Sequence, residues 1–256
     1  MPSVLRFPLR AFARSASAIV ATTSILAGCG STVALVGPGE GGEGGRADAG
    51  DAATVDADGA TLPSPWRADR FATTLTSFTK GACSGFGANR VPDVVLGPPV
   101  GGGRDQGSLD VLSLGIGGEI VLSVEPNAVV DGPGPDLLVF ENVFDVGGDP
   151  TRPNVELAEV SVSEDGTTWN AFPCTATAFP YGTCAGWHPT LSSPANGVSP
   201  VDPSVAGGDA FDLADVGLTR ARFVRIRDLS TSTCTGEGTS AGFDLDGIAI
   251  VNAANP

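Results

Sequence analysis

The stretch LAEVSVS, residues 157–163, alternates apolar and polar side chains from its second residue to its last. A period of two is typical of a β-strand with one buried face. Similar strand-like stretches are residues 119–124 (EIVLSV), 137–141 (LLVFE), 221–227 (ARFVRIR) and 247–251 (GIAIV). These stretches predict a domain built from short strands.

The segments between the expected strands have turn composition, as in residues 131–135 (DGPGP). Glycine, proline, asparagine and aspartate adopt the backbone angles that tight turns require. No stretch of 12 or more residues has a convincing amphipathic helical pattern. The sequence therefore predicts an all-β fold, an antiparallel β-sandwich or jelly roll.

The start of the chain has the pattern of an export signal. Arg6, Arg10 and Arg14 precede an apolar segment at residues 16–27, which is shorter than the roughly 20 residues of a membrane-spanning helix. Residues 26–29 (LAGC) resemble the lipobox of bacterial lipoproteins. The resemblance implies cleavage before Cys29 and attachment of acyl chains such as palmitate to this residue. An ordinary signal peptide is the alternative.

By the sorting pattern of the same family, Ser31 implies a lipid anchor in the outer membrane and exposure at the cell surface. Residues 29–62 are rich in Gly, Ala and acidic residues, so we expect a tether that does not fold. The remaining residues, 63–256, suit a single domain.

The mature chain is strongly acidic. Cleavage removes three of the 14 basic residues and none of the 29 acidic ones, which leaves a net charge of −18. Such a chain is repelled by nucleic acid, so we expect no nucleic-acid partner.

Four cysteines remain after Cys29: Cys83, Cys174, Cys184 and Cys234. In an exported chain they predict two disulfides, for which three pairings are possible. The short separation favours Cys174–Cys184 and leaves Cys83–Cys234. A zinc site is the alternative, but the sequence has no CxxC motif and a single histidine, His188.

Two resemblances concern the domain. Residues 161–169 (SVSEDGTTW), followed by 221–226 (ARFVRI), are similar to discoidin and galactose-binding-like modules, which implies a jelly roll. Residues 129–142, 207–213 and 242–246 resemble an uncharacterised family of bacterial cell-surface proteins. That resemblance spans residues 91–252 and implies surface display without a defined activity.

Motifs for catalysis are absent from the sequence. His188 is the sole histidine, no GxSxG motif accompanies it, and residues 101–104 (GGGR) lack the ending of a phosphate-binding loop. We therefore expect a non-enzyme, although abundant carboxylates leave a secreted hydrolase as an alternative.

Carboxylates and amides in turns suit calcium, which prefers oxygen ligands. The alternative is that these residues only cap turns. The candidate ligands are Asp131, Asp136, Glu141, Asn142, Asp209, Asp212, Asp244 and Asp246.

Tyr181, Trp187 and His188, with Phe179, lie in or next to the segment between the paired cysteines. Exposed aromatic faces in a constrained loop suit the stacking of sugar rings, whereas Trp169 is expected in the core. We therefore expect a surface-displayed, calcium-stabilised module that binds glycan or matrix. A purely structural or adhesive surface protein is the alternative, in which the loop simply closes the end of the core.

Overall fold

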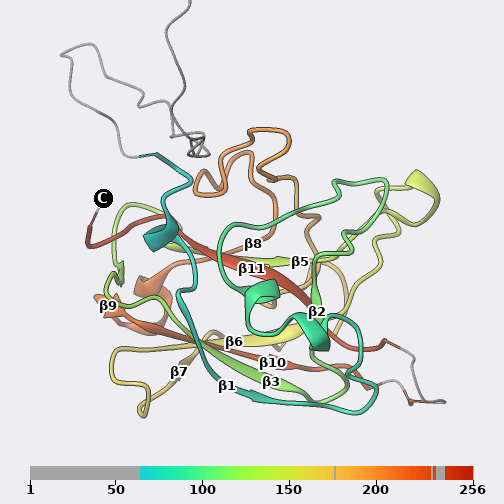
Figure 1. Cartoon of the computed structure of the whole chain (residues 1–256), viewed down its shortest axis with the longest axis horizontal. Helices are drawn as coiled ribbons and strands as arrows, with labels where there is room; N and C mark the ends of the chain where they lie inside the picture. Colours follow the sequence, from blue (N-terminus) through green and yellow to red (C-terminus); the bar gives the residue numbers. More distant parts are fainter. Residues whose placement is uncertain (1–63, 176, 232, 235–239, 256) are drawn as a thin grey trace, which may run out of the picture. The chain divides into compact units, whose positions relative to one another are not determined.

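The computed structural model describes residues 64–175, 177–231, 233–234 and 240–255. The expected signal peptide, Cys29 and the tether lie outside these residues. Within them, the all-β prediction is confirmed (Figure 1). The helices there are 3₁₀ turns of three or four residues: η1 (Ala68–Arg70), η2 (Ala88–Arg90), η3 (Asp93–Val95), η4 (Val146–Gly148) and η5 (Leu213–Val216). In this part of the chain no helix has the length and apolar character needed to cross a membrane.

Two antiparallel sheets form the two layers of the sandwich (Figure 1). The five-stranded sheet has the order β1 (Thr74–Thr79), β3 (Glu119–Ser123), β10 (Phe223–Asp228), β6 (Ala158–Ser163) and β7 (Asn170–Ala171). The four-stranded sheet has the order β2 (Leu112–Ser113), β11 (Asp244–Ile250), β5 (Leu137–Glu141) and β8 (Asp209–Phe211). A small third sheet pairs β4 (Val129–Val130) with β9 (Arg220–Ala221).

The main core lies between the two sheets. In β6 the apolar members of the alternating pattern, Val160 and Val162, are buried in it, as are Val224 and Ile226 of β10. The four-stranded sheet contributes the apolar residues Leu137, Val139, Leu245, Ile248 and Ile250. The period of two therefore places one face of each strand against the other sheet.

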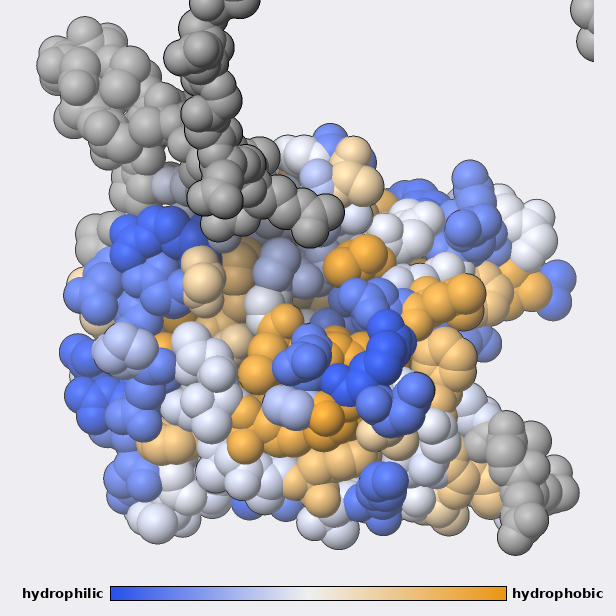
Figure 2. Space-filling view, viewed as in Figure 1, coloured by the Kyte–Doolittle hydropathy of each residue, from blue (hydrophilic) through white to orange (hydrophobic). Residues whose placement is uncertain are grey.

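The four-stranded sheet is also covered on its outer face. Phe71, Leu138, Phe140, Ala206 and Ala249 form a second buried cluster there. This second cover explains why every residue of β5 is buried and why residues 137–141 have no alternating pattern. On the face drawn in Figure 2, hydrophobic residues gather near the centre, where Figure 1 shows η2 and η3.

The stretch at residues 161–169 forms a hairpin, since β6 and β7 pair antiparallel. The connecting loop is organised by Asp165, whose Oδ1 accepts the amides of Thr168 at 2.7 Å and Thr167 at 2.8 Å. The expectation of a core position for Trp169 is wrong. Its half-buried ring lies against Arg225, with the guanidinium carbon 4.6 Å from the ring centroid, because Arg225 projects from the face of β10 opposite Val224 and Ile226.

Both expected disulfides are present. Cys174 is bonded to Cys184 and Cys83 to Cys234. The two bridges join segments separated by 10 and 151 residues, respectively.

Candidate functional site

The acidic residues expected to bind calcium lie at opposite ends of the four-stranded sheet. β5 starts directly after Asp136 and ends with Glu141. At a rise of about 3.3 Å per residue, these two positions are roughly 16 Å apart. β8 runs antiparallel to β5, starts at Asp209 and is followed directly by Asp212. Asp136 and Asp212 therefore lie at one end and Glu141 at the other, with Asp209 opposite Val139 in the middle of β5, and the set cannot share one ion.

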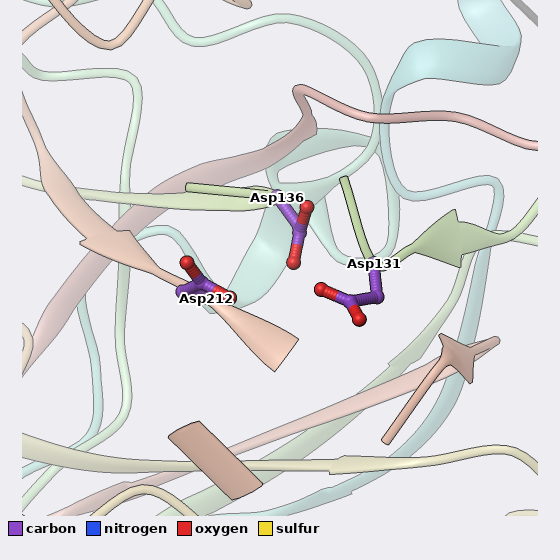
Figure 3. A group of neighbouring side chains, drawn as sticks. All are labelled: Asp131, Asp136 and Asp212. Carbon is purple, nitrogen blue, oxygen red and sulfur yellow. The ribbon is translucent and has the colours of Figure 1, made fainter. Parts of the chain in front are cut away.

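At the first end, the carboxylates of Asp131, Asp136 and Asp212 point toward a common space (Figure 3). One oxygen of each lies within 4.8 Å of the other two. Asp136 is buried, Asp212 is half-buried and Asp131 is exposed. This spacing is compatible with a calcium ion, whose oxygen ligands lie at about 2.3–2.6 Å.

The same carboxylates organise the surrounding turns. Oδ1 of Asp136 accepts the Gly132 amide at 2.9 Å and Nδ2 of Asn252 at 2.7 Å, and its Oδ2 accepts the Leu213 amide at 2.8 Å. Asp212 is the N-cap of η5. Since calcium takes about 6–8 oxygen ligands, an ion here would need several waters.

The other end of the sheet is covered by residues 172–190, which we call the aromatic loop. Its base is the Cys174–Cys184 disulfide, and Ala185 exchanges two 3.0 Å backbone hydrogen bonds with Ala158 of β6. Further along, Oγ1 of Thr190 donates to the carbonyl of Glu141 at 2.8 Å. The loop is thus attached to both sheets.

Four rings of this loop form one cluster. Phe179 lies 5.7 Å from Trp187 and 6.2 Å from Tyr181, and Tyr181 lies 6.0 Å from Trp187, all between ring centroids. The His188 ring lies 3.7 Å from that of Trp187. Phe179 is 68% exposed, His188 is exposed, and Tyr181 and Trp187 are half-buried. The structure therefore brings together the three ring residues predicted to bind a ligand and Phe179, which the sequence places in the same segment.

Asp209 holds this cluster in place. Its Oδ1 lies 2.7 Å from Nδ1 of His188, and its Oδ2 accepts the amides of Gly186 at 2.6 Å and Trp187 at 3.3 Å. Burial raises the pKa of Asp209, against the opposing effects of His188 and the two amides. Both oxygens have partners in the loop, so Asp209 anchors the loop to the sheet.

Pockets border the cluster on two sides. A pocket of about 150 Å³ is lined by Trp187, Phe179, Asp145 and Arg104, among others. A second pocket, of about 330 Å³, lies next to it, since Arg104 and His188 line both pockets. A separate pocket of about 410 Å³ is lined by Tyr181, Glu156 and Ser230, among others. Apolar rings next to charged and polar groups are typical of small-ligand sites.

Arg104 and Glu156 belong to this end of the molecule but were missed by sequence reasoning. Burial first, and then the charge of Asp244, raises the pKa of Glu156 to about 7. Glu156 lies just before β6, and an acidic residue at the start of a strand carries no recognisable signal. Arg104 lies in a glycine-rich loop and reaches Asp145 at 3.8 Å.

Two of the remaining predicted ligands, Asn142 and Asp246, accept backbone amides. Oδ1 of Asn142 accepts the Ser108 amide. Asp246 is buried, and its Oδ1 accepts the Val100 amide at 2.8 Å. Burial raises the pKa of Asp246 to about 7. Burial first, and then the charges of Asp244 and Glu156, raise the pKa of Glu141, so these three carboxylates lie in the same region.

Comparison with known proteins yields little. No family model and no curated protein matches the chain. A solved structure titled "Glycoside hydrolase" aligns with 14% identity and a TM-score of 0.25, over 53% of this chain and 19% of that one. A likeness of this degree carries no argument about fold or activity.

Proposed function

We propose that this protein is a surface-displayed binding module that attaches to glycans through the aromatic loop. The observation that supports it is the cluster of Phe179, Tyr181, Trp187 and His188, held at the end of the sandwich and bordered by pockets. Aromatic rings offer contact area with few rotamers to restrict, and a loop that is already constrained loses little entropy on binding.

The chemistry of the pockets favours a sugar over a purely apolar ligand. Trp187 and Phe179 supply apolar surface, whereas Arg104, Asp145 and His188 supply hydrogen-bonding groups around it. A sugar ring presents apolar C–H faces and polar hydroxyls at its rim, and this combination matches both kinds of surface.

We also propose that the protein is exported and anchored by lipid on Cys29 in the outer membrane. The lipobox-like residues 26–29 are the basis of this proposal. The two disulfides support it, because such bonds form and persist in oxidising compartments outside the cytoplasm.

Calcium stabilisation is proposed for Asp131, Asp136 and Asp212, the group with ligand-like spacing. Asp136 and Asp212 already accept backbone amides, so their oxygens are only partly available to an ion. We therefore expect weak binding, with a dissociation constant of about 10⁻⁴–10⁻³ M, which is the range of extracellular calcium modules.

A secreted hydrolase is the second candidate. The observation in its favour is the pair of His188 and buried Asp209, the arrangement that orients a general base. Turnover of a glycan or ester that Asp209→Asn abolishes would establish this candidate in place of the first.

The experiment for the binding function is a glycan array probed with the full chain. Trp187→Ala should lose binding at least tenfold while remaining folded. Trp169→Ala is the matched control, because Trp169 lies against Arg225 on the five-stranded sheet, outside the aromatic cluster. A parent chain that binds no glycan, or equal binding by both variants, would refute the proposal.

A further inference from the structure

The pockets on the two sides of the aromatic cluster share one segment of the chain, residues 150–157. Pro150 and Pro153 line the pocket of about 150 Å³. The residues that follow directly, 154–157, line the pocket of about 410 Å³. The segment thus passes from one pocket into the next between two consecutive residues, and the two pockets are neighbours along it.

The rings of the aromatic loop border the same two pockets. Phe179 and Trp187 line the smaller pocket, and Tyr181 lines the larger one. The ring centroids of Phe179 and Tyr181 are 6.2 Å apart. The ring cluster is therefore a short boundary between the two pockets, and a ligand in one of them lies close to the other.

The rings do not form one flat platform. The plane of Phe179 makes angles of 86° with that of Tyr181 and 84° with that of Trp187, and the planes of Tyr181 and Trp187 meet at 77°. A sugar ring stacks on one aromatic face at a time. A single sugar therefore cannot lie on Phe179 and on Tyr181 together, and contact with both sides of the cluster requires more than one unit.

The volumes of the pockets favour a ligand that is divided among them. The pocket of about 150 Å³ is smaller than the roughly 300–1,000 Å³ of typical small-ligand sites. It continues into the pocket of about 330 Å³, since Arg104 and His188 line both. Together with the pocket of about 410 Å³, the space lies in the upper part of that range. Such a row of small compartments suits an extended chain better than one compact molecule.

Hydrogen-bonding groups are present at both ends of the row. The guanidinium of Arg104 is 58% exposed and lies 3.8 Å from the carboxylate of Asp145. This distance exceeds the roughly 2.7–3.2 Å of an N–H···O hydrogen bond, so Asp145 does not use the N–H donors of Arg104. At the other end, Asn154, Glu156 and Ser230 line the pocket of about 410 Å³. Sugar hydroxyls both donate and accept, and they match guanidinium, amide and carboxylate groups alike.

The borders of this surface are fixed by the fold. The amide of Asn154 donates to the carbonyl of Phe144 at 2.8 Å, and the amide of Asp145 donates to the carbonyl of Arg104 at 2.7 Å. Pro153 has a restricted φ, which limits the segment further. A surface that is already ordered loses little entropy when a ligand binds.

We propose that this end of the sandwich binds a linear oligosaccharide of several units. The chain runs along residues 150–157, from the two pockets at Arg104 to the pocket at Glu156, and crosses the ring cluster between them. The inference rests on the proposed glycan binding and specifies its ligand as a stretch of polysaccharide rather than a single terminal sugar.

The test is an array of linear gluco-, manno-, xylo- and galacturono-oligosaccharides of one to six units, printed beside branched glycans and probed with the full chain. Calorimetry on the series that binds should show affinity rising at least tenfold from the monosaccharide to the six-unit chain. Equal affinity for both, or binding to branched glycans alone, overturns this inference and leaves the proposed glycan binding intact. A chain that binds no glycan at all refutes both.

Arg104→Ala and Glu156→Gln test the two ends separately. Each should lower the affinity for the six-unit chain at least threefold, whereas the shortest fragment that binds should be weakened by at most one of them, because it cannot reach both ends. Arg222→Ala is the matched control, since Arg222 lies before β10 and Leu229, which lines the Glu156 pocket, lies after it. The inference is overturned if either variant binds the six-unit chain like the parent. Equal losses for short and long chains in both variants would show a purely structural role and would also overturn it.

Discussion

Asp209 and His188 form one of the contacts that tie the aromatic loop to the four-stranded sheet, with Oδ1 of Asp209 2.7 Å from Nδ1 of His188. The carboxylate is buried and the imidazole is exposed at the surface. The second oxygen of Asp209 accepts two amides of the same loop, so one side chain supports the ring cluster through three contacts. Its removal should disturb both stability and binding.

Asp209→Ala leaves the buried Gly186 amide and the Trp187 amide without an acceptor. At about 1–3 kcal/mol for each of the two unsatisfied groups, we expect the free energy of unfolding to fall by about 2–6 kcal/mol. Urea denaturation followed by tryptophan fluorescence measures it. Asp202→Ala is the control, because this exposed carboxylate serves only a local turn with Ser204. Equal stability of the two variants would contradict the anchoring role of Asp209.

The two disulfides should differ in their contributions. On the chain-entropy model, a bridge across 10 residues stabilises by about 3 kcal/mol and one across 151 residues by about 5 kcal/mol. Replacing Cys83 and Cys234 by serine should therefore cost more stability. Replacing Cys174 and Cys184 should cost more glycan binding, because this bridge closes the base of the aromatic loop. Peptide mapping without reduction checks the pairing itself, and free thiols at all four positions would contradict it.

Asp165 should titrate at an unusually low pH. The amides of Thr168 and Thr167 donate to its charged form and lower its pKa. Because the folded pKa lies below the unfolded value of about 3.9, the stabilisation is present above that value and is lost as the pH falls through the folded pKa. An NMR titration of the Asp165 carboxyl group should show its titration midpoint below the unfolded value. The chemical shift of the Thr168 amide should change over the same pH range in the parent chain and should not change in Asp165→Asn. An ordinary midpoint would show that the loop hydrogen bonds do not persist in solution.

The Asp131, Asp136 and Asp212 group should respond weakly to calcium. At a concentration ten times the dissociation constant, binding stabilises the fold by about 1.4 kcal/mol. Asp131→Asn should lose this increment and Glu141→Gln should keep it. Thermal melting in calcium, with sodium at equal ionic strength as the reference, separates specific binding from screening. An increment that survives in Asp131→Asn would return these residues to turn capping alone.

Cys29→Ala tests the proposed anchor. Without the thiol, the chain should take up no labelled fatty acid and should leave the membrane fraction or accumulate as precursor. Replacement of both Cys83 and Cys234 by serine is the control for labelling, because it removes two cysteines of the folded domain, leaves no unpaired thiol there and keeps Cys29. Unchanged labelling in Cys29→Ala would refute the lipid anchor.

Local sequence predicted the strands β3, β5, β6, β10 and β11, because alternation and turn residues act over a few positions, whereas β1 (Thr74–Thr79) was not predicted. Residues 157–163 and 221–227 correspond to β6 and to β9 with β10, and the SVSEDGTTW stretch forms the expected hairpin. The short separation of Cys174 and Cys184 was sufficient to predict their bridge. The position of Trp169 was not determined in this way, since it lies at the end of the connecting loop, where the strand alternation no longer defines a face.

Only the tertiary structure decided how the carboxylates are grouped. Composition identified Asp136, Glu141, Asp209 and Asp212 as candidate ligands, but their distribution depends on the antiparallel pairing of β5 with β8. That pairing brings Asp212 to the end of the sheet where Asp136 lies, and separates both from Glu141. Other contacts, between the backbone of residues 242–244 and the ends of β5 and β10, bring Glu156, Asp228 and Asp244 near one another. Side-chain periodicity reports which face of a strand is buried and contains no information on which strand lies beside it. The grouping of the carboxylates is therefore a property of the folded chain alone.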